Sequence, residues 1–131
     1  MGLNRETPAR DAGYQFVQYL RKDITFADMA KTVSIGTLPA GAIILKPASG
    51  AQVTTAFNSA TTAVLDIGTA ADGDLYATDL HVKTAVAFLP LDEAVGFTVS
   101  ADTEITAALA QTGTAATAGA ATILIAYLPA N

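Results

Sequence analysis

The amino-acid sequence predicts an all-β protein, an antiparallel, jelly-roll-like β-sandwich that follows an extended N-terminal arm. From residue 32 onward, short runs rich in Val, Ile, Thr and Phe recur about every ten residues. Residues that favour turns, namely Gly, Pro, Asp and Asn, separate these runs. Several runs also alternate apolar and polar side chains. Regular strand spacing with turn signals is typical of sandwiches and barrels.

The expected strands follow one another along most of the chain. They span residues 32–36, 42–47, 52–57, 63–68, 74–78, 84–89, 95–100, 104–110 and 121–127. Alternation is clear for Val33 and Ile35, and for Ile123, Ile125 and Tyr127. A period of two places one face of a strand in a core and leaves the other face toward water.

The segments between the expected strands carry turn chemistry. In residues 38–41 (LPAG), proline fixes one backbone angle and glycine accepts a positive φ. Pro47 and Pro90 are expected to end strands because proline has no amide hydrogen for a β-ladder. The small-residue loop at 112–119 joins the last two strands, and we expect it to close a long hairpin.

The first part of the chain differs from the rest. Residues 1–31 hold five basic and four acidic side chains, a net charge of +1, whereas residues 32–131 hold two basic and eight acidic ones, a net charge of −6. We expect an arm at 1–22 and a sandwich domain at 23–131. A strand is expected at 24–28, and residues 14–22 fit a helix or a strand equally well.

Composition excludes several classes of function. The net charge of −5 argues against nucleic-acid binding, which needs a basic surface. The chain has no cysteine, so disulfides and thiolate chemistry are excluded. No apolar run approaches the 18 residues typical of a membrane span, so we expect no membrane partner. No motif indicates a cofactor.

Four aspartates lie close together at Asp66, Asp72, Asp74 and Asp79, which raises the question of a cation site. An EF-hand loop needs acids at its first, third and fifth positions and glycine at its sixth. Started at Asp72, the sequence has tyrosine at the fifth position and alanine at the sixth, so the motif fails. Asp72-Gly73 is instead a typical hairpin turn. We favour the turn and keep a surface calcium site as the alternative.

Two other features of the sequence are candidates for catalytic groups. Asp92 and Glu93, or Asp72 and Asp74, are the carboxylate pairs available for glycoside hydrolysis, but the chain has no Trp for a sugar platform. The single histidine, His81, has no serine in a nucleophile-elbow context. We expect no catalytic and no metal-binding residue.

Aromatic residues gather near the N-terminus between two arginines. The candidate partner-binding residues are Arg10, Tyr14, Phe16, Tyr19, Leu20 and Arg21. Aromatic and arginine side chains are the usual anchors of protein interfaces. Two interpretations remain open: these residues cover one end of the chain's own sandwich, or they pack on another subunit or a partner.

Four segments together carry a resemblance: ITFADMAKTVSIGTLPAGAIILKP (24–47), VTTAFN (53–58), VLDIGT (64–69) and SADTEITAALAQTGTAATAGAATILIAYLP (100–129). They resemble a family of tailed-bacteriophage virion structural proteins, over about residues 24–129. The resemblance implies a compact antiparallel sandwich found on virions, and a final hairpin. It implies no catalytic residue and no cofactor, and it does not extend to the arm.

The role that we associate with such sandwiches is head decoration. A decoration, or cement, protein bridges and stabilises major capsid protein subunits, commonly as a homotrimer, on the capsid surface after synthesis in the host cytoplasm. The alternatives are another virion part, such as a head-fibre base or a tail component, a carbohydrate-binding sandwich, or an enzyme.

Overall fold

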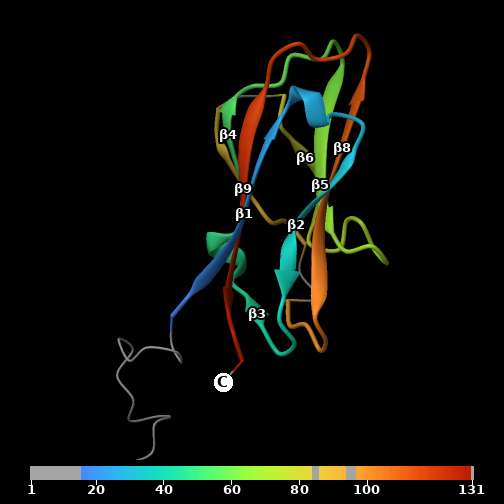
Figure 1. The fold of residues 1–131 in the computed structure, drawn as a ribbon. Helices are drawn as coiled ribbons and strands as arrows, with labels where there is room; N and C mark the ends of the chain where they lie inside the picture. Colours follow the sequence, from blue (N-terminus) through green and yellow to red (C-terminus); the bar gives the residue numbers. More distant parts are fainter. Residues whose placement is uncertain (1–15, 84–85, 94–96, 131) are drawn as a thin grey trace, which may run out of the picture.

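Two antiparallel sheets pack face to face in the computed structural model, which describes residues 16–83, 86–93 and 97–130 (Figure 1). The first sheet, which we call the β1 sheet, has the order β1 (Gln18–Thr25), β9 (Ala120–Leu128), β4 (Gly50–Thr55) and β7 (Phe88–Pro90), with β3 (Ile43–Ile44) also beside β9. The second, the β2 sheet, has the order β2 (Thr32–Leu38), β8 (Thr103–Thr112), β5 (Thr62–Gly68) and β6 (Ala77–His81). The predicted all-β sandwich is confirmed.

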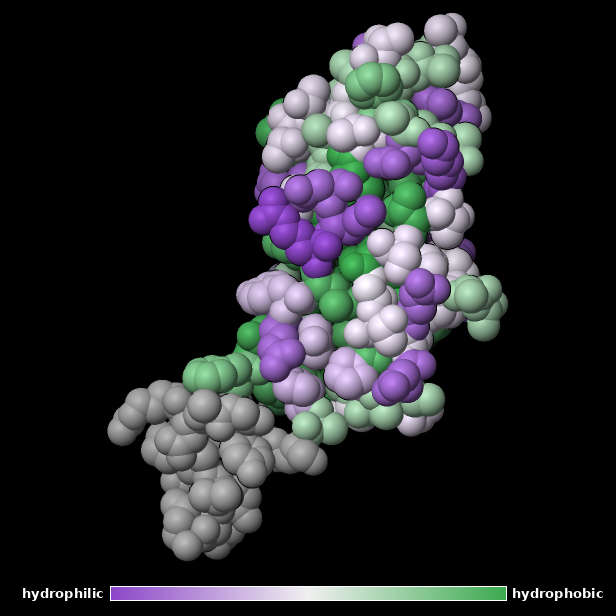
Figure 2. Space-filling view, in the orientation of Figure 1, coloured by the Kyte–Doolittle hydropathy of each residue, from purple (hydrophilic) through white to green (hydrophobic). Residues whose placement is uncertain are grey.

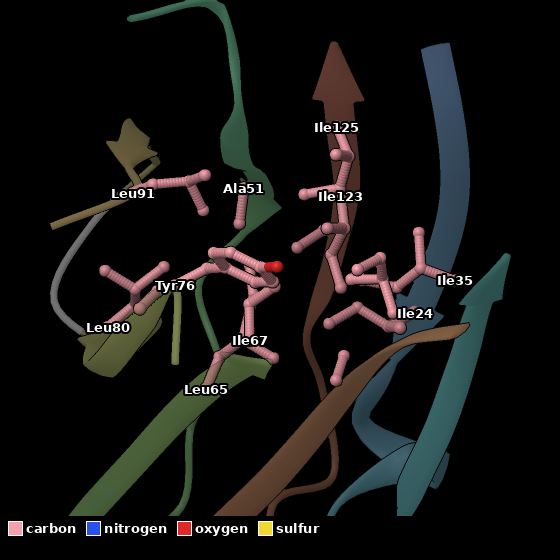
Figure 3. Packing of buried hydrophobic residues seen from close by; sticks show 14 of the residues in the cluster. Ile24, Ile35, Ala51, Leu65, Ile67, Tyr76, Leu80, Leu91, Ile123 and Ile125 are labelled. Atoms are coloured by element: carbon pink, nitrogen blue, oxygen red, sulfur yellow. The ribbon is translucent and has the colours of Figure 1, made fainter. Parts of the chain in front are cut away.

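The core lies between the two sheets and is built from alternating side chains. Ile123 and Ile125 on β9 are fully buried, as the alternation predicted, and Tyr127 is nearly so. Figure 3 shows Tyr76 among the buried side chains between the sheets, and its ring lies 5.7 Å from that of Phe97. Burying such apolar surface contributes about 25 cal/mol per Å² and is the main force that holds the sheets together.

Five expected strands match observed ones closely, and the others need correction. The strands expected at 32–36, 52–57, 63–68, 104–110 and 121–127 are β2, β4, β5, β8 and β9. The strand expected at 74–78 begins only at Ala77, because the preceding residues form the turn, and the one at 84–89 is replaced by the short β7. In 42–47 only Ile43 and Ile44 pair as a strand, because the 3-10 helix η2 (Lys46–Ala48), which contains Pro47, follows after Leu45.

The segment expected as a strand at 95–100 lies partly outside the described residues. Its described part contributes one isolated bridge, between Thr98 and Ile43. Backbone hydrogen bonds from Ile44 to Phe97 (2.7 Å) and from Val99 to Ala42 (3.1 Å) hold it against the segment around β3.

The expected hairpin between the last two strands is wrong. β8 pairs with β2 and β5, whereas β9 pairs with β1, β3 and β4, so the loop between them crosses from one sheet to the other. Asn58 fixes this crossing: its side-chain oxygen accepts hydrogen bonds from the Thr117 and Ala118 amides at 2.8 and 3.0 Å. A hairpin and a crossing have the same local sequence signals, and only such distant contacts distinguish them.

The N-terminal region needs a second correction. The strand expected at 24–28 ends at Thr25, and Phe26–Asp28 form the 3-10 helix η1. Thr25 causes this change, because its hydroxyl accepts the Ala27 amide (3.3 Å) while its own amide donates to the Asp28 carboxylate (3.0 Å). Residues 14–22 fitted a helix or a strand equally well, and β1 begins within them at Gln18. The last part of the expected arm therefore belongs to a sheet. Residues 1–15 lie outside the described part of the chain.

In the described ranges there is no helix long and apolar enough to cross a membrane.

Candidate interaction surface on the outer face of the β1 sheet

β1 sends alternate side chains to opposite faces. Leu20 and Ile24 point toward the core, and Leu20 packs on β2, where a Cβ added to Gly36 would lie 2.9 Å from its Cδ2. Tyr19, Arg21 and the other odd-numbered residues point outward. Among the candidate partner-binding residues, Leu20 therefore packs within the chain's own fold, while its neighbours on either side do not.

The aromatic candidates that the structure describes are exposed. Phe16 is 48% exposed and Tyr19 is 56% exposed. Phe26, from the same region, is 42% exposed. Arg10 and Tyr14 lie outside the described residues. The chain's own fold covers about half of each of these exposed aromatic side chains, and the other half is open to a partner.

Four further large apolar side chains are exposed: Val17, which directly precedes β1, and Ile43, Val86 and Phe88. Ile43 belongs to β3, Phe88 to β7, and Val86 lies two residues before Phe88, so all four lie on or beside strands of the β1 sheet. Sequence reasoning did not include them, although the alternation of Val86 and Phe88 in an expected strand predicts that they share a face. Every large exposed apolar residue in the described chain belongs to this sheet or flanks it.

The strand register places Phe88 on the same face as β1's exposed residues. Phe88 lies opposite Gln52 on β4, Gln52 lies opposite Thr122 on β9, and Thr122 lies opposite Asp23 on β1. These residues form one row across the outer face. The apolar side chains at its two edges therefore point to the same side of the molecule.

The outer face of the β2 sheet has a different character. Most of its outward side chains are small or polar, as shown by Thr32 and Ser34 on β2, Thr106 and Ala108 on β8, and Thr62 on β5; Val64 on β5 also points outward but is half-buried. A monomer leaves single apolar residues in water without consequence, but a set confined to one face indicates an interaction surface.

The polar part of the β1 face is a small ion-pair network. Arg21 Nε lies 3.2 Å from Asp23 Oδ1, and the Thr122 hydroxyl donates to the same oxygen at 2.9 Å. The hydrogen bond from Thr122, with a second one from Arg21, lowers the pKa of Asp23. Figure 2 shows hydrophilic side chains gathered over the middle of β1, with hydrophobic ones beside its start.

The aspartate-rich segment builds a connection between neighbouring strands. The Asp72 carbonyl accepts the amides of Thr69 (2.9 Å) and Leu75 (3.2 Å), and β5 and β6 are antiparallel partners on either side. Asp66 Oδ1 accepts the amide of Asp79 at 2.6 Å and so holds that residue at a φ of +53°. The Asp72 contacts close a connection between the two strands, as predicted, but neither Asp72 nor Gly73 has the positive φ of the expected two-residue hairpin turn. The Asp66–Asp79 contact lies where the β5–β6 register shifts.

Hydrogen bonding to Asp72 raises the pKa of Asp74, because two carboxylates side by side resist a second negative charge. Within the described ranges, no set of three or more acidic or histidine side chains is arranged to hold a metal ion.

A shallow groove opens at the sandwich edge opposite β1, between β6 and β7. Its volume is about 360 Å³, and its lining includes Leu80, Leu89, His81 and Asp92. Asp92 already accepts the Thr78 amide at 2.9 Å, and no aromatic side chain lines the groove. His81 sits at its rim as an exposed residue. Among the described residues, the lining of the groove offers no Phe or Tyr ring on which a sugar could stack.

The fold is similar to that of two chains from phage capsids. One belongs to the capsid asymmetric unit of cyanophage Pam1, with 20% identity, a TM-score of 0.70, and coverage of 87% of this chain and 85% of that chain. The other belongs to the capsid of Ralstonia phage GP4, with 15% identity, a TM-score of 0.64, and coverage of 92% and 89%. Near-equal coverage on both sides means that each matched chain is about as long as this one.

No protein-family model matches the sequence, and no curated protein matches it. At these identities, the likeness to the two capsid chains is a likeness of fold.

Proposed function

We propose that this chain is a non-enzymatic structural protein of a phage virion, and that it decorates the capsid by binding the major capsid protein. The observation that carries the proposal is the pairing of two facts. The fold is similar to that of chains of about the same length in two phage capsids, and the large exposed apolar side chains of the described residues lie on or beside one sheet. A sandwich that binds a shell through one face needs that asymmetry.

The outer face of the β1 sheet is the proposed contact with the shell. It offers Tyr19 at one edge and Phe88 at the other, with Arg21 beside Tyr19. Burying such side chains at a joint between shell subunits favours the assembled state, because a protein that binds only the assembled form stabilises it by mass action. The shell then resists dissociation better with the protein than without it.

The arm and the oligomeric state extend the proposal. Residues 1–12 include Arg5 and Arg10 and are chemically unlike the acidic body. We expect them to order on the shell, at an entropic cost that lowers the affinity of each arm. A homotrimer would present three arms and three faces at once and offset that cost by avidity. Light scattering at micromolar concentration tests the trimer, and a monomer mass counts against it.

The decisive experiment is co-sedimentation of the purified protein with emptied capsids that lack it. We expect saturable binding, a loss of at least about tenfold in affinity for a Tyr19→Ala, Phe88→Ala double variant, and unchanged binding for His81→Ala as a control on the opposite edge. Binding of the double variant at wild-type affinity would remove the β1 face from the proposal.

A second virion location is the main alternative, either a head-fibre base or a tail component. The same assay with purified tails distinguishes the two locations. Saturable binding to tails without binding to capsids would replace decoration with a tail role.

A further inference from the structure

β1 is the last strand of its sheet, and one set of its backbone groups points away from the molecule. The amide of Phe26 donates to the Gly119 carbonyl at 3.0 Å, in continuation of the β1–β9 register. In an antiparallel ladder the residues that bond to the neighbour alternate. Even-numbered residues of β1 therefore bond to β9, and the amides and carbonyls of Tyr19, Arg21 and Asp23 point outward in the plane of the sheet.

The other side of β9 confirms this assignment independently. The Ala126 amide donates to the Ser49 hydroxyl (2.9 Å), and its carbonyl accepts the Leu45 amide (2.8 Å). Even-numbered residues of β9 thus bond away from β1. Tyr19 lies opposite Ala126, so the backbone groups of these two residues cannot bond each other.

One end of this edge is closed, and the rest is open. The Thr25 amide, which also points outward, is accepted by the Asp28 carboxylate at 3.0 Å. Within the described part of the chain, the amides of Tyr19, Arg21 and Asp23 have no such partner. Three alternate donors and three alternate acceptors are the template onto which another strand adds.

The other edges of the two sheets are less suited to strand addition. β2 is interrupted by a bulge between Ser34 and Gly36, and β7 ends in Pro90, which has no amide hydrogen. β6 is interrupted by a register shift against β5 and holds Asp79 at a φ of +53°. Such features are the usual means of discouraging edge pairing. β1 has seven residues in register with β9 before its capped end, and no proline.

A second copy of β1 is a poor occupant of this edge. A two-fold antiparallel pairing that aligns the open groups has three registers. One places Arg21 opposite Arg21 of the second copy, and one leaves the two arginines as diagonal neighbours. The third pairs Arg21 with Asp23 but places Tyr19 opposite Thr25, whose amide Asp28 already accepts, so only two residues of each copy can pair. Like charges that face each other across strands are destabilising.

We propose that the open edge of β1 binds an extended segment of the capsid shell protein by strand addition, with an acidic residue of that segment opposite Arg21 and an apolar residue opposite Tyr19. The inference rests on the proposed function and specifies its contact. Arg21 points to the outer face, where a carboxylate on the added strand opposite it would complement its charge. The exposed Tyr19 ring offers apolar contact on the outer face.

The first test measures backbone amide exchange at single-residue resolution, in the free protein and on emptied capsids. In the free protein the amides of Leu20 and Lys22 should exchange slowly, because they bond to β9, while those of Tyr19, Arg21 and Asp23 exchange fast. On capsids, the odd-numbered amides should slow by at least about tenfold. Odd-numbered amides that remain fast on capsids would overturn the inference while leaving the proposed function intact.

The second test removes one edge donor without touching the bonds to β9. Arg21→Pro deletes an outward amide, and proline is tolerated on a strand edge; Arg21→Ala controls for the lost side chain. We expect Arg21→Pro to bind capsids about 3- to 10-fold more weakly than Arg21→Ala, as the loss of one hydrogen bond implies. Thermal melting of both variants checks the fold. Equal affinities of the two folded variants would contradict strand addition.

A truncated protein that lacks residues 1–12 tests whether the chain's own arm occupies the open edge of β1. If the odd-numbered amides are already protected in the free full-length protein and lose that protection on truncation, the chain's own arm occupies the edge and the inference is wrong. If wild-type protein fails to bind capsids or tails at all, the proposed function fails first, and that outcome is distinct from the others.

Discussion

Two adjacent residues on β1 give the sharpest test of how this strand is used. Leu20 points between the sheets and packs on Gly36 of β2, whereas Tyr19 points outward and is 56% exposed. Leu20→Ala should therefore lower the stability of the isolated protein and leave the outer face unchanged. Tyr19→Ala should leave the stability nearly unchanged and remove a side chain from the outer face.

The magnitudes follow from burial. Truncating a fully buried leucine to alanine costs about 2–5 kcal/mol, and Leu20 is half-buried, so we expect a loss of about 1–2.5 kcal/mol. For a domain of this size, that corresponds to a fall in Tm of about 4–10 °C. An exposed side chain such as Tyr19 contributes within about 0.5 kcal/mol, or about 2 °C.

The assay combines thermal melting by circular dichroism with capsid co-sedimentation of both variants well below their Tm. We expect Leu20→Ala to bind at wild-type affinity and Tyr19→Ala to bind more weakly. Equal losses of stability in the two variants would mean that Tyr19 is part of the core and that β1 does not alternate as described. Weaker binding by a folded Leu20→Ala protein would return Leu20 to the set of partner contacts.

Four further changes test the fold and the aspartate-rich turn. Ser49→Ala should cost about 1–3 kcal/mol in urea unfolding, because the buried amide of Ala126 loses its only acceptor among the described residues; an unchanged midpoint contradicts this. Asn58→Ala should cost about 1–2 kcal/mol by freeing two amides of the crossing loop, and an unaltered Tm would refute it. Asp72→Asn should return the pKa of Asp74 toward its ordinary value in an NMR titration, because Asp72 raises it. A raised carboxyl pKa stabilises the fold only at low pH, and this contribution disappears as pH rises through the folded-state pKa; the variant should lose that dependence. Changing both turn aspartates to asparagine should shift Tm by only a few degrees, and a large stabilisation by added Ca²⁺ that this double change abolishes would overturn the turn interpretation.

The sequence predicts the sandwich well because its strongest signals are local. The alternation of Ile123, Ile125 and Tyr127 requires one buried face, and the turn at Asp72 fixes which strands are neighbours. The path of the chain between sheets depends on distant contacts instead. The carboxamide of Asn58 meets a loop about 60 residues away in sequence, and no local pattern distinguishes that crossing from a hairpin.

The candidate surface was predicted in part, for a physical reason. The aromatic cluster before β1 is visible as composition, and it includes Tyr19, which is exposed, and Leu20, which is not. A helix would have placed these neighbours on one broad face, whereas a strand sends them to opposite faces. The choice between helix and strand at 14–22 therefore decides which residues belong to the surface.

The pairing of the strands adds Phe88 to this surface. Phe88 lies far from β1 in sequence. The pairing of Asp23 with Thr122 on β9, of Thr122 with Gln52 on β4, and of Gln52 with Phe88 nevertheless places Phe88 on the same outer face as Asp23. Parity also fixes the backbone: the residues of β1 whose side chains point outward are the same ones whose amides point to the open edge. Tyr19 and Arg21 thus present side chain and backbone to one partner at once. A strand that adds to β1 continues the β1 sheet, so its outward side chains lie on the same face as those of Phe88 and Tyr19. In the proposed complex, face contact and strand addition would therefore be parts of one interface, and a change at Tyr19 should weaken both.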